Sequence, residues 1–246
     1  MSTSRFSVLS LNIHKGLSPL NRRVIVHDLR DRLHAASPDI VFLQEVQDAH
    51  DHHLAQRADW PALAQSSYLA GNLWPEIHYG RNAVYDHGHH GNLILSRFQV
   101  KAVRNDDISE HRYERRGLLH AIVEAGGAHV HCFCVHLGLF ERGRRRQIDA
   151  IVAAITERAP ADEPVIVAGD FNDWRNLAEA RLAAAGLVDV FRVHHVRLPR
   201  TFPGRLPLLR LDRIYTRGLA LVEAEALRSW SRLSDHLALT ATFELP

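Results

Sequence analysis

The sequence predicts an α/β or α+β fold, because short apolar runs typical of strands recur along the chain and amphipathic helical patterns lie between some of them. Of the 246 residues, 46% are hydrophobic and 24% are charged, which are ordinary values for a globular protein. We find no internal repeat, low-complexity tract or linker, and therefore expect one domain over residues 1–246.

Seven runs rich in Val, Ile, Leu and Phe are the predicted strands. In the last run apolar residues alternate with small or polar ones, which is typical of a strand covered on one face. The predicted strands are residues 6–13, 39–45, 91–97, 129–136, 165–170, 211–216 and 237–243.

Three segments carry apolar residues at helical spacing, namely residues 22–36, 142–159 and 176–187. The third is expected to begin with Asn176 as its N-cap and to stop at Gly186. Residues 86–91 and 194–209 are predicted to be long surface loops, because glycine, proline and histidine dominate them.

The bulk charge narrows the choice of partners and compartment. A formal net charge of +2 is too small to predict strong binding of polyanions by the whole surface. Positive charge comes almost entirely from arginine, whose fork suits phosphate, although genomic base composition explains such a bias equally well. Cys132 and Cys134 are interpreted as small buried residues on one strand face. Without a signal peptide or a membrane span in the sequence, we expect a cytoplasmic protein.

Polar residues stand where the predicted strands end or begin. Four strands end in such residues, and the last two begin with them. If the last two strands run antiparallel to most of the others, all of these side chains meet at one edge, where a rigid scaffold can present them to a crevice. The residues at strand ends are Asn12, Glu45, His136, Asp170 and Asn172, and those at strand starts are Asp212, Asp235 and His236.

This set of residue types indicates a particular chemistry. Clustered carboxylates repel one another unless a cation neutralises them. Oxygen ligands of this kind suit Mg²⁺ or Mn²⁺, and the remaining amides and imidazoles can donate hydrogen bonds to an anionic substrate. The set therefore predicts metal-assisted hydrolysis of a phosphoester.

Other interpretations of single motifs are weaker. An acid after a strand, such as Asp170, is often only a cap or a turn residue. A serine-hydrolase triad at Ser234, Asp235 and His236 fails because the side chains of consecutive residues diverge. In "DFND" we expect Asp170 and Asn172 to face the same way in an extended chain, Phe171 to point into the core, and Asp173 to cap the next segment.

The motifs taken together resemble the endonuclease/exonuclease/phosphatase superfamily. They are "LNIHKG", "LQEV", "HGNLILSR", "VHLGL", "AGDFND", "LDRIY" and "LSDHLAL", which occur in the family's order over residues 11–239. The longer runs "YGRNAVYDHGHHGN" and "RTFPGRLPLLRLDRIY" look most like its bacterial YbhP-like branch. The resemblance implies a DNase I-like, four-layer α/β sandwich with two mixed β-sheets packed face to face and helices outside.

The resemblance also implies roles for the polar residues. Glu45 would be the principal Mg²⁺ or Mn²⁺ ligand with Asn12 beside it, and Asp235 would assist His236 or hold a second metal. Asp170 would orient or deprotonate the attacking water. Asn172 would hold that water or a phosphate oxygen. His236, steadied by Asp212, would contact the scissile phosphate, and His136 would donate to the charge developing on phosphorus.

Substrate binding is expected from Asn92, His14 and Arg146, and two departures from the family pattern bear on the substrate. His14 stands where abasic-site endonucleases carry an aspartate, and His136 stands where they carry a tyrosine; both argue against that activity. The resemblance leaves the roles of His87, His89 and His90 open between a substrate contact, a zinc site and a solvated loop.

The substrate remains open among several phosphoesters. The basic segments 111–117 and 141–147 and the side chains of Trp174 and Trp230 could serve nucleic acid, although a solvated face and core packing explain them as well. Residues 206–211 offer the only apolar loop suited to a phospholipid. We expect a monomeric enzyme acting on a phosphoester, with an endo- or exonuclease-type activity as the leading hypothesis. The alternatives are a hydrolase of small or lipid phosphoesters and an inactive binding module with the same fold.

Overall fold

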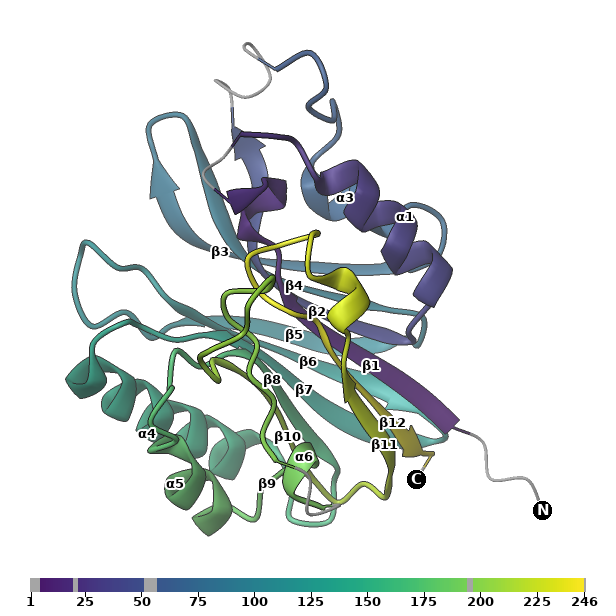
Figure 1. The fold of residues 1–246 in the computed structure, drawn as a ribbon. Helices are drawn as coiled ribbons and strands as arrows, with labels where there is room; N and C mark the ends of the chain where they lie inside the picture. The colour runs from purple at the N-terminus through teal and green to yellow at the C-terminus, as the bar shows by residue number, and fades with distance from the viewer. Residues whose placement is uncertain (1–4, 20–21, 51–56, 194–196, 246) are drawn as a thin grey trace.

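A computed structural model describes residues 5–19, 22–50, 57–193 and 197–245, and it places two mixed β-sheets face to face with helices on both outer sides (Figure 1). The first sheet has the strand order β11-β12-β1-β2-β4-β3, and the second has the order β5-β6-β7-β8-β10-β9. This arrangement confirms the predicted fold class and the four-layer sandwich.

The strands of the first sheet are β1 (Arg5–Asn12), β2 (Ile40–His50), β3 (Glu76–Tyr85), β4 (Gly88–Ser96), β11 (Leu221–Ala226) and β12 (Leu239–Glu244). Those of the second are β5 (Val100–Asp107), β6 (Gly117–Ala125), β7 (Ala128–His136), β8 (Val165–Asp170), β9 (Val188–Asp189) and β10 (Asp212–Arg217). The helices are η1 (His14–Gly16), α1 (Val26–Ala36), α3 (Gln65–Ala70), α4 (Glu141–Arg158), α5 (Ala178–Ala184), α6 (Val190–Val193) and η3 (Arg228–Trp230).

Three apolar layers hold the sandwich together, because alternate residues of each central strand face opposite sides. In β1, Phe6 and Val8 pack between the two sheets, whereas Leu9 and Leu11 pack under α1 and α3. In the second sheet, Phe133 joins the layer beneath α4 and α5. Strands buried on both faces explain why these segments read as continuous apolar runs.

Strand directions bring the predicted polar ends to one edge. β1 runs parallel to β2, and β7 runs parallel to β8. β12 is antiparallel to β1, and β10 is antiparallel to β8. The ends of the four parallel strands therefore meet the start of β10 and the segment before β12, as the sequence predicted.

Two local predictions are wrong. Residues 86–91 form the β3–β4 hairpin and its turn, so His89 and His90 lie in a strand rather than in a surface loop. The N-terminus of α5 is capped by Asp173, whose Oδ2 accepts a hydrogen bond from the Ala178 amide at 2.7 Å. The backbone of Asn176 is left-handed, with φ 62, and its side chain contacts Glu179 instead.

The close approach of β8 to β7 requires a glycine at position 169. Its φ is +148, and a Cβ built on it would lie 1.9 Å from the Val135 carbonyl oxygen of β7. Only glycine lets β8 approach β7 this closely just before Asp170. Elsewhere in the chain, the described helices include none that is long and apolar enough to cross a membrane.

Candidate active site

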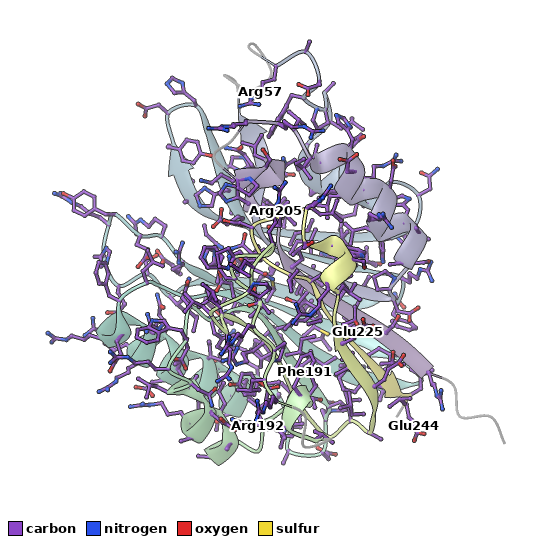
Figure 2. All side chains as sticks on the ribbon, in the orientation of Figure 1. Arg57, Phe191, Arg192, Arg205, Glu225 and Glu244 are labelled. Carbon is purple, nitrogen blue, oxygen red and sulfur yellow. The ribbon has the colours of Figure 1, made fainter. Side chains whose placement is uncertain are left out.

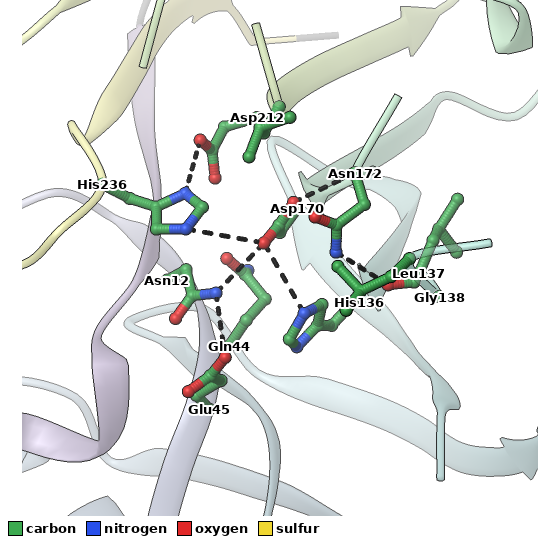
Figure 3. A network of polar contacts seen from close by, with 12 residues as sticks. Asn12, Gln44, Glu45, His136, Leu137, Gly138, Asp170, Asn172, Asp212 and His236 are labelled. Atoms are coloured by element: carbon green, nitrogen blue, oxygen red, sulfur yellow. Dashed lines mark hydrogen bonds and ion pairs between the residues drawn. The ribbon is translucent and has the colours of Figure 1, made fainter. Parts of the chain in front are cut away.

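The Asp170 carboxylate lies at the centre of the polar cluster, at the end of β8 (Figure 3). Its Oδ2 accepts a hydrogen bond from Asn12 Nδ2 at 3.1 Å and lies 3.5 Å from His136 Nε2 and 3.7 Å from His236 Nε2. Three nitrogens from the two sheets thus converge on one oxygen. Burial raises the pKa of Asp170 to about 6, even though the His236 charge opposes that rise.

His236 is held as a cation by carboxylates. Its Nδ1 lies 2.9 Å from Asp212 Oδ2, and the ring is almost fully buried. Burial alone would lower the pKa of His236, but the Asp212 and Asp170 carboxylates outweigh it and raise that pKa to about 10. Asp212 Oδ1 is buried with no hydrogen-bond partner in the described part of the chain. His236 therefore bridges two carboxylates at neutral pH.

His136 behaves in the opposite way. It ends β7, directly beside Asp170 in the neighbouring parallel strand. Burial lowers its pKa well below 6.5, and the positive charges of Arg116 and His236 lower it further. His136 is consequently a neutral imidazole beside the cationic His236.

Asn172 reaches the cluster by a tight turn rather than in an extended chain. Its φ is 49, and its backbone amide donates to Asp170 Oδ1 at 2.9 Å. Its side-chain nitrogen donates to the Leu137 carbonyl at 2.9 Å. Asparagine tolerates left-handed backbone, which allows this turn. As expected, Phe171 between them is fully buried in the core.

Glu45 is aimed by a bulge in β2. The register between β2 and β4 shifts between Leu43 and Val46, and Glu45 itself has φ 56. Bulges redirect side chains, and a left-handed glutamate is strained, so this conformation is costly and specific to the site. Glu45 Oε1 accepts a long hydrogen bond of 3.4 Å from Asn12 Nδ2.

Asp235 and His14 contact each other rather than His236. Asp235 Oδ2 lies 3.4 Å from His14 Nδ1, at the wall of the cleft. The neighbouring Ser234 Oγ donates to the Asn12 carbonyl at 2.6 Å, which fixes the "SDH" segment to the end of β1.

These side chains line a cleft of about 490 Å³, together with Lys15, Arg116 and Trp174. The sequence reasoning named Trp174 and the segment of Arg116 only as candidate contacts to nucleic acid, and it did not select Lys15. Lys15 and Arg116 bring positive charge, and Trp174, which is 50% exposed, brings an aromatic face. Lys15 stands inside "LNIHKG", so its motif could have identified it. Arg116 stands beside Arg115 in "HRYERRG", and nothing in the sequence distinguishes the two.

Several predicted residues lie elsewhere. Arg146 is exposed and pairs with Glu110 outside the cleft, so Arg116 is the arginine that reaches it. Asn92 Nδ2 donates to the carbonyls of Gly117 and Cys134, so its amide bridges the two sheets. Trp230 is only 5% exposed and belongs to the core rather than to a groove.

The histidines of the β3–β4 hairpin do not form a zinc site. His89 and His90 are adjacent in β4, so their side chains point to opposite faces. His89 Nδ1 lies 3.0 Å from the Tyr79 hydroxyl, whereas His90 borders a small hollow with Glu45 and Arg116. Burial lowers the pKa of His90 to about 4, so this ring is neutral.

Two groups of side chains offer oxygen atoms to a metal ion. Asp170, Asp212 and His236 place one ligand atom each within 4.8 Å of one another, but the imidazolium already supplies positive charge there. Glu45 has no cationic partner within ion-pair distance among the described residues, and Asn12 turns its amide nitrogen toward it. A carboxylate that lines a cleft without a cationic partner among the described residues fits Mg²⁺, which uses one or two carboxylates and several waters. Glu45 is thus the better-suited ligand.

Comparisons with known proteins agree over nearly the whole chain. A sequence model of the endonuclease/exonuclease/phosphatase family matches residues 9–236. The protein YbhP of Escherichia coli strain K12, itself uncharacterized, is 45% identical over 245 residues, covering 98% of this chain and 96% of that protein. Tyrosyl-DNA phosphodiesterase 2 of Danio rerio is 27% identical over 272 residues, covering 98% of this chain and 67% of that protein. A solved structure from Beutenbergia cavernae has a TM-score of 0.76 at 20% identity and covers 98% of this chain and 72% of its own.

Proposed function

Because the chain belongs to the endonuclease/exonuclease/phosphatase family, whose members are phosphoester hydrolases, we propose that it cleaves a phosphodiester of nucleic acid by in-line attack of water, with Mg²⁺ or Mn²⁺ as cofactor. The resemblance carried by the sequence motifs is thereby confirmed, including the likeness to the YbhP-like branch. The substrate, the ion and the role of each residue belong to this proposal.

The observation that carries the proposal is the convergence on Asp170 Oδ2 of nitrogens from Asn12, His136 and His236. A carboxylate with a pKa of about 6 is ionised at neutral pH, yet it is basic enough to take a proton from an attacking water. Asn172 anchors the other oxygen of Asp170, so the carboxylate cannot rotate away from the cleft.

The surrounding charges suit a phosphate. His236 presents a protonated Nε2 to the cleft, and Asp212 fixes the orientation of its ring from the other side. Lys15 and Arg116 also line the cleft. Fixed donors of this kind stabilise the charge that develops on the phosphoryl oxygens without reorganising during the reaction. His136, being neutral, can donate a hydrogen bond without adding charge.

The Glu45 carboxylate would hold the divalent ion, with Asn12 beside it and Asp235 across the cleft. When bound, such an ion supplies Lewis-acid polarisation of a phosphoryl oxygen. The chain's own contribution is to point Glu45 at the cleft through the bulge in β2.

Two features favour nucleic acid as the substrate. The relative from Danio rerio is named a tyrosyl-DNA phosphodiesterase. The half-exposed ring of Trp174 borders the cleft, and exposed aromatic rings offer stacking surfaces to bases.

A lipid or small phosphoester is the second candidate, supported by the apolar loop between β9 and β10. Leu206 and Leu208 are 69% and 57% exposed, and Leu209 lines the cleft beside them. Exposed apolar side chains next to a hydrolytic cleft are what a membrane substrate would need. An inactive binding module is the third candidate, and the full set of acidic, amide and imidazole groups argues against it.

The test is an assay of the purified protein with Mg²⁺, Mn²⁺ or EDTA. The substrates are single- and double-stranded DNA, RNA, abasic DNA, bis(p-nitrophenyl) phosphate and phospholipid vesicles. We expect metal-dependent cleavage of nucleic acid and of the aryl diester, and loss of both in Asp170→Asn and His236→Ala. Turnover of phospholipid alone would replace the nuclease hypothesis by the lipid one. No turnover with any metal, or wild-type rates in both variants, would refute the enzymatic proposal.

A further inference from the structure

A second hollow of about 470 Å³ opens beside the catalytic cleft and is lined by arginines. It lies where the loop before α1, the loop before β10 and the segment after η3 come together. Its charged side chains are Arg22, Arg23, Arg205, Arg232 and Asp28.

Three chain segments line first the cleft and then this hollow. Lys15 lines the cleft, and Ser18 lines the hollow. In the second segment, Phe202 lines the cleft and Arg205 lines the hollow. Asp235 lines the cleft, whereas Leu233, two residues earlier, lines the hollow. Two residues span at most ~7 Å of chain, so the two sites are neighbours. Figure 2 labels Arg205 near the middle of this face of the molecule.

The arginines of the hollow are free of ion pairs. In the described ranges, none of the four guanidiniums has a carboxylate within 4.0 Å, although many other arginines of the chain do. Asp28, on the first turn of α1, is the one carboxylate of the wall. Positive charge therefore exceeds negative charge by three in a hollow large enough for a phosphate. Guanidinium groups bind phosphate through paired hydrogen bonds and are weakly hydrated, so they lose little on binding.

We infer that this hollow is a phosphate-binding subsite that holds a second phosphate of the substrate cleaved at Asp170. The inference rests on the proposed function and deepens it, because a second phosphate at this distance belongs to a substrate with several phosphates. Successive phosphates of one strand are ~3.4 Å apart along a duplex axis. The hollow therefore suits a phosphate close to the scissile one in the same strand.

The test compares the double variant Arg205→Gln/Arg232→Gln with Arg5→Gln/Arg32→Gln, which removes the same charge from exposed arginines outside both sites. Binding of a fluorescein-labelled single-stranded oligothymidylate is measured by anisotropy in EDTA, over a range of salt concentrations. Turnover of bis(p-nitrophenyl) phosphate, which has a single phosphate, is measured in Mg²⁺.

We expect the Arg205/Arg232 variant to bind the oligonucleotide at least fivefold more weakly. The slope of log affinity against log salt should flatten by about 0.7, the value for one phosphate contact on a single strand. Its kcat/KM for the aryl diester should stay within twofold of wild type, because that substrate cannot reach the hollow. The Arg5/Arg32 variant should match wild type in both measurements.

Wild-type binding by the Arg205/Arg232 variant, or an equal loss in the Arg5/Arg32 variant, would overturn the subsite. Absence of aryl diester turnover in the wild-type protein would instead overturn the proposed function, while the binding measurement still reports on the hollow. Competition by a nucleoside 3′,5′-bisphosphate identifies the source of the second phosphate. Competition as strong as that of the strand indicates a small molecule, and weaker competition indicates the strand itself.

Discussion

His120 is expected to make the protein sensitive to acid, and replacing it by glutamine should remove part of that sensitivity. The ring lies in β6, is only 4% exposed, and stacks on Phe133 with ring centroids 4.1 Å apart. Its Nε2 is 3.0 Å from His131 Nδ1, and His131 Nε2 is 2.5 Å from Glu163 Oε2. If both rings were protonated, an N–H of His120 would face an N–H of His131, and neither nitrogen could accept a hydrogen bond. Protonation of both rings therefore breaks the hydrogen bond between them.

The pKa of His120 gives the sign and the size of the effect. Burial, together with the neighbouring His131 and Arg158 charges, lowers that pKa to about 3. The unfolded chain, with a histidine pKa near 6.5, therefore binds more protons than the folded protein between pH 6.5 and pH 3. Stability is complete above that window and falls as the pH falls through it. The loss attributable to His120 is about 2 kcal/mol at pH 5 and about 4 kcal/mol at pH 3.

The assay is urea unfolding followed by circular dichroism at pH 8 and pH 5. Between these two values, His120→Gln should lose about 2 kcal/mol less unfolding free energy than wild type, whatever its absolute stability. The exposed His111→Gln is the matched control and should keep the wild-type difference within about 0.5 kcal/mol. The reasoning is refuted if His120→Gln loses as much stability as wild type between the two pH values.

Three further substitutions test the site and its frame. Gly169→Ala places a Cβ 1.9 Å from the Val135 carbonyl oxygen, so its free energy of unfolding in urea should fall by more than about 2 kcal/mol. An unchanged free energy of unfolding would contradict the close-approach argument. Asp212→Asn removes the carboxylate that raises the pKa of His236, so kcat on the aryl diester at pH 7 should fall by about 10²–10⁴-fold at similar KM, and a wild-type kcat would contradict the pairing. Glu45→Gln should raise the Mg²⁺ concentration for half-maximal activity and weaken Mg²⁺ binding in calorimetry, and unchanged binding would assign the ion to other residues.

The sequence predicted the central strands other than β6, and the edge at which the polar residues meet, because strands buried on both faces are continuous apolar runs with abrupt polar ends. β6 was missed although it is central and mostly buried. The sequence did not predict β5, most of whose residues are exposed, because an edge strand shows no such run. β11 was missed for the same reason, since it lies at the edge of the first sheet and is only partly buried.

Within the site, the motif residues could be identified from the sequence, but the backbone conformation that positions them could not be predicted. An extended "DFND" correctly placed Phe171 in the core, yet Asn172 reaches Asp170 through a left-handed turn that the sequence does not encode uniquely. The helix with Arg146 follows His136 closely in sequence, but an ion pair with Glu110 holds that arginine away. Arg116 enters the cleft because its Nε donates to the Leu137 carbonyl at 3.1 Å, a contact between distant segments.

The hydrogen bond from Asn12 to Asp170 joins residues 158 positions apart, and His236 completes the cluster just before the last strand. The order of synthesis on the ribosome therefore matters. Asn12, the first side chain of the cluster, is synthesised early, but Asp170 is available to it only after β8 has been synthesised. His236 is synthesised later still, in the segment just before β12, and this segment is held near Asn12 by the pairing of β12 with β1. A growing chain thus carries no assembled cluster until β12 is available to pair with β1.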